Sequence, residues 1–157
     1  MQYIVIDLEW NGGYSRKAHG YFNEIIEVGA ERLNETLEVV DTFQANVRPV
    51  VSKKLSDIVT DLTTIKPEDL EDGTTISGLL AQLRRFAGTE PTVYLTWSTT
   101  DLLVMMENCR FFLHHQEVPG LEYYMDFQAY AQDRMGVTGG QVGLARAGEM
   151  LGIPEDD

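Results

Sequence analysis

The sequence has a single cysteine, Cys109, among its 157 residues. One cysteine cannot form an internal disulfide and cannot build a cysteine-rich metal site, so we expect a small buried hydrophobe there. No stretch approaches the roughly 20 apolar residues that a membrane-spanning helix needs. Met1 leads directly into a strand-like run, without the basic and apolar segments of a secretion signal. These absences predict a cytoplasmic protein.

Basic residues are also scarce: 12 Lys and Arg face 25 Asp and Glu, for a formal net charge of -13. This charge balance argues against an extended basic surface that would bind long nucleic acid. A site that reads only a strand end needs few phosphate contacts, so local binding stays open. The hydrophobic content of 43% is enough for one globular domain with a real core.

Two carboxylates interrupt the strand-like run that opens the sequence. Its apolar, β-branched and aromatic residues predict a buried central strand with both faces covered. Because side chains alternate, Asp7 and Glu9 project from one face, while Ile6, Leu8 and Trp10 pack on the other. Neighbouring carboxylates repel each other unless a cation lies between them, and hard oxygen ligands suit Mg²⁺ or Mn²⁺. The alternative is that both acids lie past the sheet edge, in water.

The remaining segments alternate between strand and helix patterns. Strands over residues 23–33 and 37–47 would follow the first strand in an antiparallel meander. Further along, we predict a strand over 92–97 and helices over 52–62, from Pro67, and over 75–86, 100–114, 126–135 and 141–151. This order implies an α/β layer fold with a mixed sheet.

Two local patterns make sharper predictions. Asn11-Gly12-Gly13-Tyr14 indicates a turn, followed by a polar loop through Gly20. Leu55, Ile58, Val59 and Leu62 recur at helical spacing, which places them on one face of a helix that Lys53-Lys54 would open.

Asp101 falls in the first turn of the helix predicted over 100–114, after the hydroxyl residues Ser98, Thr99 and Thr100. An acid there can simply stabilise the helix dipole. A functional role requires this helix end to lie over the first strand.

Several segments together resemble the DEDD-type 3'-to-5' exonucleases of the ribonuclease-H-like fold. The resemblance spans nearly the whole chain, in order, through residues 4–11, 24–30, 47–50, 62–65, 97–101, 126–128 and 143–153. It implies a nuclease that hydrolyses phosphodiester bonds at the 3' end of single-stranded RNA or DNA.

The resemblance also implies roles for individual residues. Asp7 would bridge two Mg²⁺ or Mn²⁺ ions, Glu9 would hold the ion that carries the attacking water, and Asp101 would hold the other. Trp10 and Asn11 would flank the terminal nucleotide, with Leu62 and Thr63 opposite. For Trp10, plain core packing is an equal alternative.

One departure from the family pattern concerns its final motif, a histidine followed five residues later by aspartate, which does not occur in residues 1–157. We therefore expect one exonuclease-like domain over 1–157 that stops short of this motif, and a nearly inactive polypeptide. A catalytically impaired module that binds nucleic acid or a partner is the competing interpretation. A plain structural domain, whose three acids never converge, is a third.

Overall fold

A mixed five-stranded sheet organises the computed structural model, which describes residues 1–52 and 54–154. The strand order is β3-β2-β1-β4-β5; β2 is antiparallel to β1 and β3, and β4 is parallel to β1 and β5. The strands are β1 (Gln2–Ser15), β2 (Gly20–Leu33), β3 (Val39–Asn46), β4 (Thr92–Thr96) and β5 (Tyr124–Asp126). The predicted antiparallel meander and mixed sheet are confirmed.

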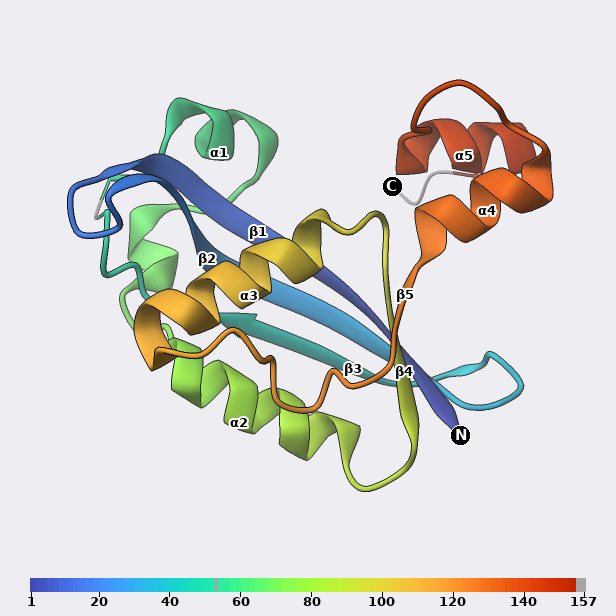
Figure 1. Ribbon diagram of the computed structural model, residues 1–157, viewed down its shortest axis with the longest axis horizontal. Coiled ribbons are helices and arrows are strands. Elements are labelled where there is room, and N and C mark those ends of the chain that lie inside the picture. Colours follow the sequence, from blue (N-terminus) through green and yellow to red (C-terminus); the bar gives the residue numbers. More distant parts are fainter. Residues whose placement is uncertain (53, 155–157) are drawn as a thin grey trace.

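Helices complete the fold (Figure 1). They are α1 (Asp57–Leu62), the 3-10 turn η1 (Pro67–Leu70), α2 (Ile76–Ala87), α3 (Thr100–Leu113), α4 (Phe127–Met135) and α5 (Leu144–Leu151). Figure 1 shows α2 and α3 on one side of the sheet, and α4 and α5 beyond the end of β5. Within the described part of the chain, no helix is both long and apolar enough to cross a membrane.

The first strand is central, as predicted, but only one of its faces is covered. Ile4, Ile6 and Leu8 are buried in the main core against α2 and α3. On the other face, Val5 is 41% exposed and Asp7 is exposed. The prediction that both faces are covered is therefore wrong around Val5 and Asp7, because α2 and α3 pack on the same side of the sheet; further along, Asn11 is buried against the segment that leads into α1.

The first hairpin is longer than the sequence suggested. Strand pairing continues through the predicted turn as far as Ser15 opposite Gly20, so the turn lies at residues 16–19. Both glycines lie within the strand rather than at a reversal. A Cβ at Gly12 would collide with the hydroxyl of Tyr21 on β2, whereas a Cβ at Gly13 would meet nothing within 4 Å.

The helix predicted over 52–62 is also shorter. It begins at Asp57, where the Ser56 hydroxyl accepts a hydrogen bond from the Val59 amide. Leu55 and Val59 are buried with Ile26 in a second, smaller core cluster, but Ile58 and Leu62 are exposed. Lys54 precedes the helix instead of opening it, and Lys53 lies outside the described residues.

The central part of the chain follows the prediction closely. The four residues predicted to face inward from α2 are buried: Ile76, Leu79, Leu80 and Leu83. Gly88 ends α2 with a φ of 69°, a conformation that glycine adopts without strain. Cys109 is fully buried in α3, and burial raises the pKa of its thiol.

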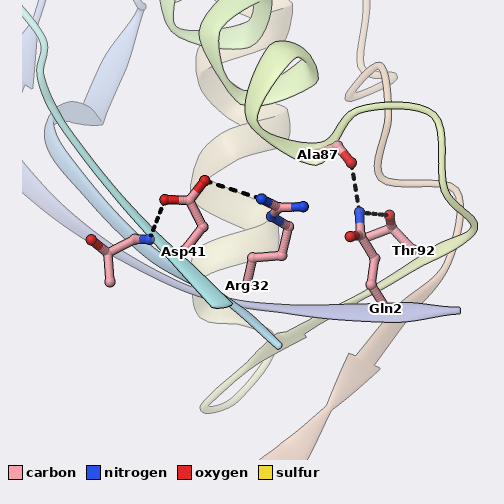
Figure 2. A network of polar contacts seen from close by, with 6 residues as sticks. Gln2, Arg32, Asp41, Ala87 and Thr92 are labelled. Carbon is pink, nitrogen blue, oxygen red and sulfur yellow. Dashed lines mark hydrogen bonds and ion pairs between the residues drawn. The ribbon is translucent and has the colours of Figure 1, made fainter. Parts of the chain in front are cut away.

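Polar groups at the start of β1 are paired (Figure 2). The Gln2 side-chain amide donates to the Ala87 carbonyl at 2.6 Å and to the Thr92 hydroxyl at 2.9 Å, which ties β1 to β4 and to the end of α2. On the neighbouring strands, Arg32 and Asp41 form an ion pair at 3.0 Å. These contacts tie this end of the sheet together, although the buried Nε of Arg32 has no hydrogen-bond partner among the described residues.

Candidate active site

Asp7 and Glu9 project together from the open face of β1, as the strand alternation predicts. Glu27 of β2 is the cross-strand partner of Glu9, and Gly29 is the partner of Asp7. Directly paired residues point to the same side of a sheet, so Glu27 joins the two acids. The Glu27 carboxylate accepts a hydrogen bond from Gln44, whereas Asp7 and Glu9 form no side-chain hydrogen bond or ion pair with any described residue.

Asp101 reaches the same strand from α3. Its Oδ1 accepts a hydrogen bond from the backbone N–H of Leu8 at 3.1 Å, and the side chain is only 7% exposed. Leu8 lies between Asp7 and Glu9, so the start of α3 does lie over β1, as a functional role for Asp101 requires. Electrostatic repulsion links Asp101 to both Asp7 and Glu9.

The turn before α3 is held by a small hydroxyl network. The hydroxyls of Thr96 and Tyr124 both donate to the Ser98 carbonyl, at 2.5 and 2.8 Å, and lie 2.7 Å from each other. Ser98 itself adopts a φ of 81°, in the left-handed region that favours glycine. These bonds join β4 and β5 to the turn that positions Asp101.

Burial and mutual repulsion make the ionised site costly. Although Asp7 is exposed in part, partial desolvation by its surroundings, and then the charge of Glu27, raise the pKa of its carboxyl. The pKa of Glu9 is raised by burial and by three acidic neighbours, Asp7, Glu27 and Asp101. For Asp101, burial is the largest cause and raises the pKa to about 6, against the lowering effect of the Leu8 N–H bond. A cation among these groups would lower all three pKa values.

The donor set fits a hard divalent cation in its chemistry. Carboxylate oxygens are the ligands that such ions prefer, and Asp7 and Glu9 have oxygens free of other described partners. Within residues 1–52 and 54–154, however, no three His, Cys, Asp or Glu side chains gather closely enough to hold one ion. Asp7, Glu9 and Asp101 are therefore neighbours, but their carboxylates do not form a complete coordination site for one ion.

The four residues predicted to contact the terminal nucleotide differ in their availability. Leu62 is 81% exposed at the end of α1. The Thr63 hydroxyl is used locally, donating to the Val59 carbonyl at 2.8 Å. Trp10 is half-buried and packs against the main core, on the face opposite Asp7.

Asn11 is buried and has a structural task. Its amide donates to the Lys54 carbonyl at 3.0 Å, and its Oδ1 accepts from the Ser56 N–H at 2.8 Å. Both bonds fix the segment that leads into α1. Since these bonds occupy the side chain, Asn11 positions α1 in this structure; its predicted contact with a nucleotide stays a prediction.

Two buried polar residues near the site escaped the sequence analysis. Glu24 is 2% exposed and accepts backbone N–H bonds from Val50, Val51 and Ser52. Asn108 of α3 is fully buried; it accepts from Ile25 N–H and donates to the Asn23 carbonyl. The only sign in the sequence was a polar residue inside an apolar run. The backbone groups that bind it lie far away in the sequence, so its role could not be predicted.

The family of the chain follows from its sequence as a whole. A model of the Exonuclease family (RNase_T) matches residues 4–156, which is nearly the full length. The chain belongs to this family. The relationship predicted from the motifs is thus confirmed, and the DEDD-type exonucleases of this family generally use divalent metal ions.

Two curated members of the family are similar to the chain. The protein named "Probable 3'-5' exonuclease KapD" of Bacillus subtilis (strain 168) is 29% identical over 111 residues, which cover 69% of this chain and 53% of that protein. "ERI1 exoribonuclease 2" of Homo sapiens is 31% identical over 129 residues, covering 66% of this chain and 18% of that protein. The chain therefore spans about half or less of these curated relatives.

Solved structures support the fold of the family. The nuclease domain of 3'hExo, described as a DEDDh family member bound to rAMP, superposes with a TM-score of 0.82 at 23% identity. The match covers 99% of this chain and 81% of that one. The predicted ribonuclease-H-like fold is confirmed.

Proposed function

We propose that this chain is the core of a metal-dependent 3'-to-5' exonuclease, which hydrolyses phosphodiester bonds at the 3' end of single-stranded RNA or DNA. The observation that carries the proposal is the bond from Leu8 N–H to Asp101 Oδ1. It joins an acid on α3 to the strand that bears Asp7 and Glu9, in a chain that belongs to an exonuclease family.

Asp7, Glu9 and Asp101 would hold Mg²⁺ or Mn²⁺, as a two-ion site once substrate phosphate contributes its oxygens. Divalent ions at such a site supply Lewis-acid stabilisation of the reacting phosphate. The chain's own contribution is to keep the carboxylates together: strand alternation sets Asp7 beside Glu9, and the Leu8 amide fixes Asp101.

A terminal nucleotide would lie between the open face of β1 and α1. Leu62 is the most exposed of the predicted contacts and offers an apolar surface for a base. Asn11 serves this site indirectly, because its two backbone bonds hold the segment leading into α1.

Among the residues that the structure describes, no histidine accompanies the three acids. His19 lies in the turn of the first hairpin, and His114 and His115 follow the far end of α3. We therefore assign metal binding to these residues but no general base. The cytoplasmic location expected from the sequence also stays a prediction.

The test measures metal binding and cleavage separately. Mn²⁺ binding is followed by electron paramagnetic resonance, and cleavage by release of mononucleotides from 3'-labelled single-stranded RNA and DNA. Asp7→Asn should lose both, whereas the exposed Asp133→Asn should lose neither. Mn²⁺ binding without cleavage favours the impaired binding module, and wild-type behaviour of Asp7→Asn contradicts the proposal.

A further inference from the structure

Two segments stand apart from the acidic character of the chain. Residues 10–23 and 42–56 contain none of the 25 Asp and Glu, but five of the 12 Lys and Arg. The structure joins them: Asn11 binds the backbone at Lys54 and Ser56, and Glu24 binds the backbone of residues 50–52. Apart from the adjoining Glu24, whose carboxylate is occupied by these backbone bonds, the charged residues described on these two segments are basic: Arg16, Lys17, Arg48 and Lys54.

The hairpin tip, residues 14–21, concentrates this charge. The turn is built by His19 N–H donating to the Arg16 carbonyl at 3.2 Å and by Ala18 N–H donating to the Ser15 hydroxyl at 3.3 Å. Arg16, Lys17 and His19 are all exposed, and neither Arg16 nor Lys17 forms an ion pair with a described residue. Their charges are available to an outside anion.

Two aromatic residues flank the same turn. Tyr14 and Tyr21 are direct cross-strand partners, so they project from one side of the hairpin. They are 78% and 67% exposed, which is unusual for large side chains with apolar rings. Exposed aromatic rings beside basic side chains are the combination on which unpaired bases stack while the phosphates are neutralised.

We propose that the hairpin tip binds single-stranded nucleic acid upstream of the cleaved end, with bases against Tyr14 and Tyr21 and phosphates at Arg16 and Lys17. This inference rests on the proposed function for its direction, because β1 continues from Asp7 and Glu9, past a bulge in its pairing after Glu9, to the tip. Strand alternation places Tyr14 on the face of Trp10, so the nucleic acid would cross the edge of the hairpin between the acids and the tip. Lys54 adds charge on the adjoining segment.

The strand sets the distance between the two sites. Seven residues separate Glu9 from Arg16, which at about 3.3 Å each is roughly 23 Å. A stacked strand rises about 3.4 Å per nucleotide, so the tip lies roughly seven nucleotides from the 3' end. An oligonucleotide of three residues bound at the acids cannot reach the tip, whereas one of twelve can.

The first test is binding of fluorescent twelve-residue oligonucleotides, dT and rU, in EDTA and at several salt concentrations, followed by anisotropy. The double variant Arg16→Gln/Lys17→Gln should lower the slope of log affinity against log salt by about 1.4, since each contact with a single strand contributes about 0.7. Arg84→Gln/Arg85→Gln removes the same charge from the exposed end of α2 and should leave the slope unchanged.

The second test separates stacking from charge. Tyr14→Ala should weaken binding about fivefold or more, while Tyr14→Phe keeps the ring and should bind like the wild type. Circular dichroism and urea unfolding check that each variant folds. Equal binding by all the hairpin variants, or equal loss in the α2 control, overturns the proposal.

The third test uses length. With Mn²⁺, the hairpin variants should raise the KM for twelve-residue substrates and leave three-residue substrates unaffected. Cleavage that needs Asp7 but ignores the hairpin at both lengths keeps the proposed function and overturns only this inference. If Arg16→Gln/Lys17→Gln instead abolishes a salt-sensitive self-association, the tip binds the acidic surface of a second copy, and the nucleic-acid assignment is wrong.

Discussion

Glu24 and Asp7 are acids on neighbouring strands of one sheet, and their surroundings are opposite. Glu24 is buried deeper, yet three backbone N–H groups surround its carboxylate. Asp7 is more exposed and has no described hydrogen-bond partner, while Glu9 and Glu27 stand beside it. A buried charge with its partners supplied by the chain serves the architecture. A group of acids without partners indicates that something positive must come from outside.

The largest effect, on the rate of cleavage, should come from removing the carboxylate of Asp7, which has no described hydrogen-bond partner. Asp7→Asn keeps the size of the side chain but lowers its affinity for a hard cation. In a longer form of the chain that also carries the family's final histidine–aspartate motif, we expect 3'-end cleavage to fall by a factor on the order of 10²–10³, as for loss of a central electrostatic contact. Initial rates on labelled RNA with saturating Mn²⁺ measure this. A fall of less than tenfold would place the chemistry elsewhere.

Glu24→Gln tests the paired acid. Its amide would present N–H groups to backbone N–H groups, so we expect the free energy of unfolding to fall by about 2–3 kcal/mol. Urea unfolding measures the change. The control is Glu31→Gln at an exposed position, whose free energy of unfolding should stay within about 0.5 kcal/mol of the wild type. Wild-type stability in Glu24→Gln would mean that its carboxylate is not an anchor.

Asp101→Asn should stabilise the metal-free protein at neutral pH. The pKa of Asp101 is raised to about 6 from an ordinary 3.8, so the neutral form is favoured on folding. The stability that this shift contributes is fully present below about pH 3.8 and is lost as the pH rises through about 6. Asparagine retains the acceptor for Leu8 N–H and cannot ionise. The variant should therefore gain about 2–3 kcal/mol at pH 7.5 and little at pH 4.

Thermal unfolding across this pH range measures the effect of Asp101→Asn. Mn²⁺ should raise the Tm of the wild type more than that of the variant, since the variant keeps the repulsion among Asp7, Glu9 and Glu27 but lacks the part that involves Asp101. A variant with the same pH profile as the wild type would show that this carboxyl does not titrate in the way its burial indicates.

The smallest effect is expected at the turn before α3. Ser98 pays for a positive φ that costs a side chain about 1–2 kcal/mol, and glycine would remove this strain at a cost of chain entropy. Ser98→Gly should gain up to about 1 kcal/mol in the free energy of unfolding. Ser98→Ala, which keeps the strain and loses the hydroxyl, should gain nothing; equal stability of the two variants would contradict the account.

Local patterns were enough to predict much of this molecule. Alternation in β1 placed Asp7 and Glu9 on one face, and helical spacing gave the inward residues of α2, because both signals depend on nearby residues alone. The bond between Asp101 and Leu8 joins residues 93 positions apart. The sequence showed that a functional role for Asp101 requires the start of α3 to lie over β1, but it could not show that this contact forms.

Other features depended on contacts that no local pattern contains. The three-residue strand β5 exists by pairing with β4 and is too short to show a period. The spacing of Leu55, Ile58, Val59 and Leu62 predicted one shared helix face, but the helix begins only at Asp57, and only Leu55 and Val59 belong to the small cluster around Ile26. Glu24 finds its partners some 26 residues away, so nothing beside it in the sequence marked it as an anchor.

The sole thiol of the chain, Cys109, is a natural probe for the opening of this fold. It is fully buried where α3 meets the sheet, so a thiol-specific dye can reach it only when α3 lifts away. The rate of labelling therefore reports how often α3 separates from the sheet, without an engineered probe. Because α3 also carries the acid that accepts from the Leu8 amide, the same labelling rate reports how often Asp101 leaves the strand that bears Asp7 and Glu9.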